Sequence, residues 1–157
     1  MTTKTDFVYV TYISTTPEKV WSALQDAEMT KLFWGRARNV SDWHVGSTWT
    51  HGSYDDPSVI DVTGTIVESE PPRRLVVTWK SAKAASPDEP ASRVTYLIES
   101  VFGAVRLTVT HDELVADSAM HKGVSSGWPA ILSSLKTLLE TGAPMPMTTR
   151  RWGAPPA

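Results

Sequence analysis

Two side chains in the second half of the chain could take part in proton transfer. His111 follows Val105, Leu107 and Val109 in strict alternation, which places all four on one face of a strand. Imidazole titrates near neutral pH, so an inward His111 could orient a ligand oxygen or carry a proton. Tyr96 could offer a hydroxyl group to the same space. The alternative for both is a structural role, in which a backbone carbonyl or a buried hydroxyl holds the side chain.

The remaining reactive residues form no catalytic or metal-binding motif. The four histidines include no i, i+4 pair and no helical His-Glu motif, so we expect no metal site. The absence of cysteine excludes disulfides, thiolate ligands and a cysteine nucleophile. Ser125 and Ser126 lie in no Gly-x-Ser-x-Gly elbow. We therefore expect no cofactor and no catalytic residue, and a binding protein is favoured over an enzyme.

Composition sets the class of protein. The 157 residues suit one domain over residues 1–145, followed by a flexible tail at 146–157 that carries several Pro and Gly residues. A net charge of −2 offers phosphates no basic face, so nucleic acid is not an expected partner. No apolar run is long enough to span a membrane, and no secretion signal is evident, so we expect a cytoplasmic protein.

A long helix near the C-terminus is the expected centre of the fold. Apolar residues recur at helical spacing from Trp128 to Leu139 and form one wide stripe. Ser126 is the expected N-cap, Pro129 lies in the first turn, and Gly142 ends the helix. The stripe must be buried, and the rest of the chain offers mostly strands to cover it.

Those strands are short, rich in β-branched and aromatic residues, and separated by turn residues. They are expected at residues 7–13, 40–45, 47–51, 59–69, 74–80, 93–100 and 105–114. Two short helices are expected after the first strand, the second over residues 27–33, and a mobile hairpin loop over residues 81–90. The sequence therefore predicts an α+β fold with a curved antiparallel sheet of six to seven strands around the C-terminal helix.

Several segments, in their order along the chain, resemble a known family. They are TPEKVWSAL at 16–24, FWG at 33–35, GTIVE at 64–68, PPRRL at 71–75, TW at 78–79, LTVTH at 107–111 and GW at 127–128. Over residues 6–141 the chain resembles the activator of heat-shock-protein-90 ATPase homologue-like family of the START/Bet v-like (SRPBCC) superfamily. The resemblance implies a helix-grip fold with an apolar cavity between helix and sheet, and no fixed catalytic constellation.

The predicted function is reversible binding of a small apolar or aromatic ligand in that cavity, without chemistry. Broad aromatic walls with a few polar tips suit such a ligand. The candidate lining residues are Trp21, Leu24, Phe33, Trp34, Trp49, Tyr96, Leu107, Val109, His111, Met120, Val124, Trp128, Ile131 and Leu135. The alternative for this set is a fully packed core.

Two other functions remain open from the sequence. The resemblance also implies a protein-interaction module of the chaperone-activator kind, and His111 with a cavity tyrosine could serve a cyclase or dehydratase as acid and base. A homodimer, paired through an apolar sheet edge or the face of Trp43, is a further expectation.

Overall fold

Seven strands of the protein form one antiparallel sheet, in the order β1-β7-β6-β5-β4-β3-β2. A computed structural model describes residues 3–82 and 89–152. The strands are β1 (Lys4–Ile13), β2 (Ala37–Val40), β3 (Thr48–Ser53), β4 (Ile60–Glu70), β5 (Arg74–Ser81), β6 (Ser92–Val101) and β7 (Ala104–Val115). The helices are α1 (Pro17–Gln25), α2 (Ala27–Phe33) and α3 (Ala119–Thr141). This is the α+β, helix-grip arrangement that the sequence predicted.

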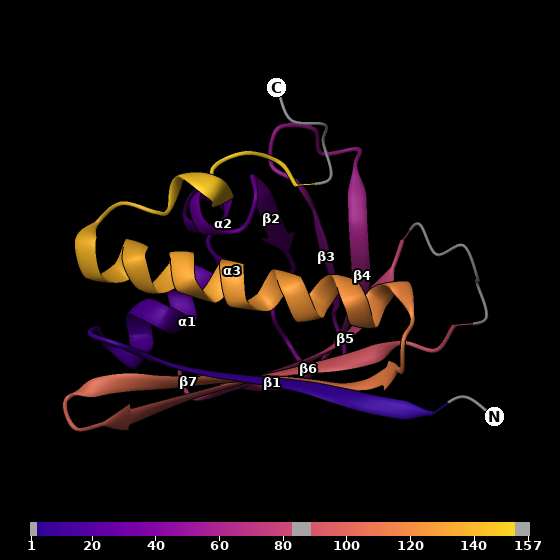
Figure 1. Ribbon diagram of the computed structural model, residues 1–157, viewed down its shortest axis with the longest axis horizontal. Coiled ribbons are helices and arrows are strands. Elements are labelled where there is room, and N and C mark those ends of the chain that lie inside the picture. Colours follow the sequence, from indigo (N-terminus) through magenta and orange to yellow (C-terminus); the bar gives the residue numbers. More distant parts are fainter. Residues whose placement is uncertain (1–2, 83–88, 153–157) are drawn as a thin grey trace.

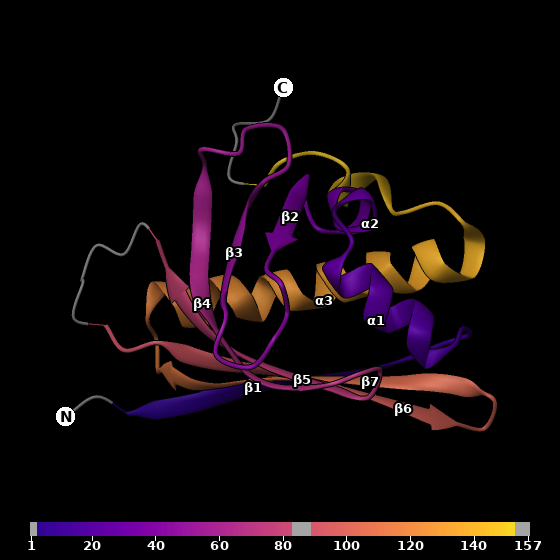
Figure 2. The same ribbon diagram turned by 180° about the vertical axis from the view of Figure 1, so that it is seen from behind.

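The sheet bends strongly around α3. Strands β1, β7, β6 and β5 form a floor beneath the helix, while β4, β3 and β2 rise beside it (Figures 1 and 2). The two short helices α1 and α2 connect β1, on one edge of the sheet, to β2 on the other. They lie next to β2, on the same side of α3 as the rising strands (Figures 1 and 2).

The long helix is longer at its N-terminus than its apolar stripe predicts. It begins at Ala119, where the Ser118 hydroxyl oxygen accepts a hydrogen bond from the His121 amide at 3.1 Å. The expected cap at Ser126 is wrong: that residue lies inside the helix, and its hydroxyl donates to the Gly123 carbonyl at 3.2 Å. The C-terminal boundary is confirmed, because Gly142 has a left-handed φ of 86°.

The second strand was expected at residues 40–45 but lies at Ala37–Val40, so the two ranges share only Val40. Residues 41–47 form a loop in which Trp43 and Gly46 have φ values of 64° and 91°. Positive φ is incompatible with a continuing strand, and the alternating pattern does not reveal it. The other strand and helix positions agree with the sequence-based expectation to within a few residues, and most of the loop expected at 81–90 lies outside the described residues.

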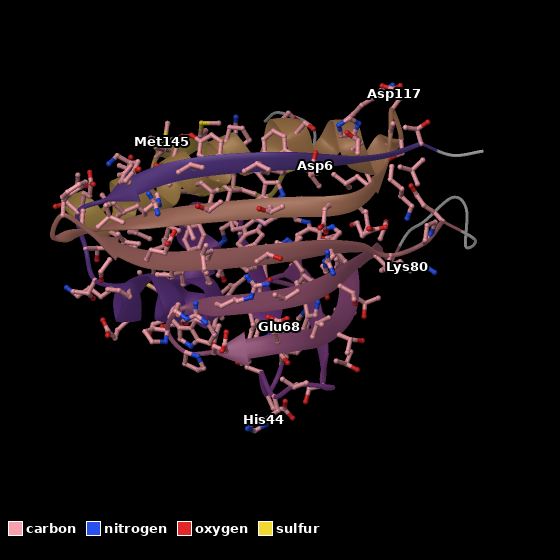
Figure 3. All side chains as sticks on the ribbon, turned by 90° about the horizontal axis from the view of Figure 1, so that it is seen from below. Asp6, His44, Glu68, Lys80, Asp117 and Met145 are labelled. Atoms are coloured by element: carbon pink, nitrogen blue, oxygen red, sulfur yellow. The ribbon has the colours of Figure 1, made fainter. Side chains whose placement is uncertain are left out.

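Alternation along the strands divides the sheet into a buried face and an exposed face. On β7, Val105, Leu107, Val109 and His111 are fully buried toward α3, and the residues between them face outward. The outward face is seen in Figure 3, where charged residues such as Glu68 lie over the strands. The apolar core therefore lies between α3 and the concave face of the sheet, as the helical stripe required.

The segment after α3 packs against the domain as far as Trp152. The fully buried Thr148 hydroxyl donates to the Leu32 carbonyl at 2.9 Å and lies 2.7 Å from the Ser134 hydroxyl. Arg151 pairs with both carboxylate oxygens of Asp61, at 2.9 and 2.8 Å. The sequence predicted a flexible tail from residue 146, whereas residues 146–152 have these fixed contacts. Residues 153–157 lie outside the described residues.

Candidate functional site

Trp128 occupies the centre of the space between α3 and the sheet. Its side chain is 2% exposed, and its ring lies 5.4 Å from Trp34, 5.6 Å from Trp79 and 5.9 Å from Tyr96, measured between ring centroids. The contact with Tyr96 is edge-to-face, with an interplanar angle of 80°. The region in which the sequence predicted a cavity therefore contains a packed cluster of aromatic rings.

His111 belongs to a continuous series of hydrogen bonds that runs from Trp128 to the Trp79 carbonyl. The Trp128 indole N–H donates to Nδ1 of His111 at 3.1 Å, so Nδ1 must carry the lone pair. The proton of the neutral ring is then on Nε2, which lies 2.7 Å from Oγ of Ser92. Ser92 in turn donates to the Trp79 carbonyl at 3.2 Å. Both ring nitrogens thus have protein partners.

These contacts favour a structural role for His111. Burial lowers its pKa from 6.5 to about 4 despite the opposing effect of the nearby Asp112 carboxylate, so the ring is neutral at pH 7. To exchange a proton with a ligand, His111 would have to break a hydrogen bond to Trp128 or Ser92. A cyclase or dehydratase mechanism through this residue has no support in the geometry.

A second buried histidine, His51, is held by a residue that the sequence did not suggest. Nδ1 of His51 lies 2.8 Å from Oδ1 of Asn39, and Nδ2 of Asn39 donates to the Leu24 carbonyl at 2.9 Å. Burial lowers the pKa of His51 to about 4. The alternation of Trp49 with His51 in β3 was the available signal for an inward histidine; nothing in the sequence pointed to Asn39.

Among the predicted site residues, Tyr96 is the one whose polar group suggests a place for a ligand. The side chain is 4% exposed, and its hydroxyl makes no hydrogen bond among residues 3–82 and 89–152 but remains accessible to a water-sized molecule. It lines a small pocket beside the aromatic cluster. The other lining residues are Leu24, Asn39, Trp43, Trp49, Leu75 and Val77.

The pocket is mainly apolar and narrow. Its free volume is about 10 Å³, room for one water molecule, whereas ligand pockets usually measure about 300–1,000 Å³. The indole N–H of Trp49 is already bonded to the Thr78 carbonyl at 2.8 Å, so it is not available to a ligand. A ligand larger than water can enter only if a lining side chain moves.

Trp43 is the lining residue best placed to move, because it belongs to the loop at 41–47. Its backbone has a φ of 64°, a conformation that is costly for a bulky side chain. The loop combines local polar contacts, including the Trp43 amide to Oγ of Ser41 at 3.0 Å, with two backbone bonds to β4: the Gly46 amide to the Ile66 carbonyl at 2.8 Å and the Ile66 amide to the Ser47 carbonyl at 2.9 Å. The bonds to Ile66 hold the end of the loop, whereas the contacts around Trp43 itself are local and can be exchanged for water at little cost.

The predicted lining residues divide between this pocket and the packed core. Only Leu24, Trp49 and Tyr96 line the pocket. Met120 lines a separate space of about 10 Å³ near the start of α3, together with Trp79, Ser92 and Leu114. Trp21 is partly buried at the margin of the core. The remaining predicted residues, buried in the core, are Phe33, Trp34, Leu107, Val109, His111, Val124, Trp128, Ile131 and Leu135.

Within residues 3–82 and 89–152, no three His, Asp or Glu side chains converge as metal ligands would. None of the helices in this part of the chain has the length and apolarity needed to cross a membrane.

Comparison with known proteins assigns the chain to a family. The model of a family described as "Activator of Hsp90 ATPase homolog 1-like protein" matches residues 14–140. No curated protein matches the chain in sequence. Many solved structures are similar to it, and all of those compared below are less than 25% identical, so they establish the fold alone.

Three of these structures illustrate the likeness. CalU16 from Micromonospora echinospora is 19% identical, with a TM-score of 0.68 over 88% of this chain and 78% of its own. The Aha1 dimer from Colwellia psychrerythraea is 20% identical, with a TM-score of 0.68 over 88% and 98%. PFC0360w, an HSP90 activator from Plasmodium falciparum, is 22% identical, with a TM-score of 0.68 over 85% and 95%.

Proposed function

The chain belongs to the Activator of Hsp90 ATPase homolog 1-like family, and we propose that it binds a small, uncharged aromatic or apolar molecule at the pocket beside Tyr96, without chemistry. The observation that carries this proposal is the Tyr96 hydroxyl, which makes no hydrogen bond within the described residues and lies in a mainly apolar pocket. Tyr96 as a whole residue is 4% exposed. A ligand oxygen or nitrogen could supply a partner for this hydroxyl in the place of water.

The lining of the pocket indicates the charge of the ligand. None of the seven lining residues is ionised at pH 7, since burial raises the pKa of the Tyr96 phenol above its usual value near 10. A charged ligand would lose its hydration there without gaining a counter-charge. An uncharged molecule with one hydrogen-bonding group for Tyr96 and a flat apolar body for Trp43 and Trp49 suits the site best.

Entry of the ligand requires a rearrangement, and outward movement of Trp43 is the one proposed. Removing that indole from the pocket opens the space between Leu75, Val77 and Trp49. The ligand would then replace the apolar contacts of Trp43, which contribute roughly 25 cal/mol per Å² of buried area. Trp43 fluorescence should therefore change on binding.

The experiment begins with native mass spectrometry of freshly purified protein to look for a bound small molecule. Fluorescence titration with a library of uncharged aromatic compounds follows. The Tyr96→Phe variant keeps the ring and removes the hydroxyl, so it should weaken binding roughly 3- to 12-fold, the equivalent of about 0.5–1.5 kcal/mol. Tyr12→Phe, the same change at a residue on the outer face, is the matched control.

Two results would reject the proposal. One is a library in which no compound binds and a purified protein that carries no small molecule. The other is binding that neither Tyr96→Phe nor Trp43→Ala alters.

Chaperone activation is the second candidate function, and it is favoured by the family description and by the HSP90 activator among the similar structures. It would require a protein-binding surface rather than an internal pocket. Acceleration of a chaperone ATPase by the purified protein would support it, and no acceleration at a saturating concentration would exclude it.

Self-association is also part of the proposal, since one similar structure is a dimer. A location in the cytoplasm is proposed on the sequence features alone.

A further inference from the structure

The hairpin between β6 and β7 carries a phenylalanine that is fully exposed. Val101 pairs with Ala104, and the two residues between them, Phe102 and Gly103, have φ values of 52° and 78°. Positive φ at both central positions is what a type I′ turn requires. The exposed fraction of Phe102 is 103%, so its side chain contacts almost nothing in its own chain.

Phe102 is unfavourable at this position for two independent reasons. Type I′ turns favour Asn, Asp or Gly at the first central position, because a larger side chain is strained at positive φ. In addition, its aromatic ring is left in water, although a solvent-exposed turn needs no apolar side chain. A residue that is strained and also exposed in the free chain is best explained by a contact with a partner.

The same chain contains a groove that suits a phenyl ring. It lies between α1, the start of α2 and the end of α3, and its volume is about 320 Å³. A cavity of about 150 Å³ can hold benzene, so the groove has room for a phenylalanine side chain and part of a turn. Its lining residues are Glu18, Lys19, Ser22, Ala23, Asp26, Met29 and Leu139.

The groove is apolar beneath and polar at its rim. Ala23 is buried, and Met29 and Leu139 are partly buried, whereas the polar lining residues are exposed. The tip of the hairpin, residues 101–104, has no charged residue. It could therefore pass the rim without burying an unpaired charge.

Hairpin and groove lie at the same end of the molecule. The β6–β7 turn, α1 and the C-terminal end of α3 are together at one end of the long axis, in both opposite views (Figures 1 and 2). A two-fold axis passing between the hairpin and the groove could bring each hairpin of a pair to the groove of the other copy. In such a two-fold interface the same contact forms twice, because the exposed residue of each copy meets the groove of the other.

We propose that two copies of this chain associate about a two-fold axis, with the Phe102 ring of each inserted into the α1–α2–α3 groove of the other. The inference rests on the proposed self-association and names its surface. A lipid surface is a poorer partner for the hairpin, because Arg106, the basic residue nearest the turn, is paired with Glu99 at 3.1 Å, which leaves no basic cluster for anionic lipid.

The test is sedimentation velocity over a concentration series, with one variant on each side of the contact. Phe102→Asn removes the ring and should weaken the dimer at least 100-fold. Ser22→Arg places a long charged side chain in the groove and should weaken it to a similar degree. An equimolar mixture of the two variants retains one intact contact, so it should form a heterodimer that neither variant forms with itself.

A thermal measurement separates loss of contact from loss of folding. At concentrations at which the wild-type protein is monomeric, Phe102→Asn should raise Tm by about 2–4 °C, the effect of roughly 1 kcal/mol on a chain of this size. Higher Tm together with a weaker dimer is the expected result, and unfolding of the variant could not produce it.

The possible failures are distinguishable. A wild-type protein that stays monomeric up to millimolar concentration would overturn both self-association and this surface. A dimer that persists in both variants would overturn the surface and leave self-association standing. Binding of the wild-type protein to phosphatidylcholine or phosphatidylglycerol vesicles, abolished by Phe102→Asn in a protein that remains monomeric, would replace the second copy by a lipid.

Discussion

At the scale of single residues, the buried polar groups beneath α3 differ in how well they are satisfied. His111 has partners for both ring nitrogens, whereas the Tyr96 hydroxyl makes no hydrogen bond in the described part of the chain and remains accessible to a water-sized molecule. Satisfied groups make one packing arrangement specific, and an unsatisfied group favours a bound partner. The hydrogen bonds of these two residues therefore support both conclusions: a ligand site beside Tyr96 and a structural role for His111.

Replacing His111 should show its structural role. His111→Leu leaves the Trp128 indole N–H and the Ser92 hydroxyl without their present partner, and each buried unpaired group costs about 1–3 kcal/mol. We expect the free energy of unfolding in urea to fall by at least 2 kcal/mol. His44→Leu, at an 84% exposed side chain, should change it by less than about 0.5 kcal/mol. A His111→Leu protein as stable as the wild type would contradict the assignment.

The two buried histidines also predict a pH dependence of stability. Their pKa values are lowered from 6.5 to about 4 by burial, so between these pH values the unfolded chain binds protons that the folded chain does not. The free energy of unfolding should therefore be at its full value above about pH 6.5 and decrease as the pH falls toward 4. The expected slope is at most about 1.4 kcal/mol per pH unit for each histidine.

Urea denaturation at half-unit steps from pH 7.5 to pH 4.5 would measure this slope. Carboxylates whose pKa is lowered, such as Asp55 beside Arg36, act in the same direction, but mainly below their ordinary pKa of 3.8. A flat profile between pH 7 and pH 5 would be inconsistent with two neutral buried imidazoles.

At the scale of elements, Gly64 on β4 leaves room for the Trp49 side chain of β3 to cross β4 and bond to β5. Trp49 of β3 pairs with Gly64 of β4, and its indole reaches the Thr78 carbonyl on β5 at 2.8 Å. A Cβ added to Gly64 would lie 1.9 Å from that carbonyl oxygen and 2.5 Å from the indole nitrogen. Only glycine leaves the space for this contact, and Trp49 is also a wall of the proposed pocket.

The Gly64→Ala variant should therefore be strongly destabilised. We expect a loss of more than about 3 kcal/mol in the free energy of unfolding, because Trp49 and the strand backbone would both have to shift. Gly123→Ala is the control: it is a helical glycine with no atom within 4 Å of the added Cβ, and it should be neutral or stabilising by up to about 1 kcal/mol. Similar stabilities for the two variants would contradict the close approach.

The edge of the sheet shows how α3 limits association. The Lys136 ammonium donates to the Tyr12 carbonyl, and Glu140 accepts from the Ser14 amide at 2.7 Å, so this end of the β1 edge already has partners. An occupied edge cannot pair with a second strand. The exposed hairpin turn between β6 and β7 is therefore a better candidate for an interface than this part of β1.

At the scale of the whole molecule, the segment after α3 fastens the helix to the rising strands. Thr148 joins it to Leu32 and Ser134, and Arg151 joins it to Asp61 on β4. The Trp152 ring covers Gly35, where an added Cβ would lie 3.1 Å from the ring. The segment thus connects parts of the domain that are far apart in sequence.

Ending the chain at Met145 should test this role. The truncation would leave the buried Ser134 hydroxyl and the Leu32 carbonyl without Thr148, so we expect a loss of roughly 2–4 kcal/mol in the free energy of unfolding. Met147→Ser, at a side chain that is 46% exposed, should cost less than about 0.5 kcal/mol. An unchanged melting curve after truncation would mean that residues 146–152 contribute nothing.

Local sequence patterns were sufficient for most of the elements and for the fold class, but not for the start of α3 or the position of β2. Alternation placed His111 and Tyr96 on the inner face of the sheet, and the apolar stripe with Gly142 set the end of α3, because these features depend on neighbours within one strand or a few turns. The family segments were recognisable for the same reason, since each lies within one stretch of chain.

The tertiary structure alone decided which groups are satisfied and where a ligand could bind. The partners of His111 are 17 and 19 residues away in sequence, Thr78 is 29 from Trp49, and Thr148 is 116 from Leu32. Periodicity tells which way a side chain faces but not which side chain it meets there. The packing of Trp128 into the expected cavity, and the free hydroxyl of Tyr96 beside it, depend on such distant contacts and could not be predicted from the sequence.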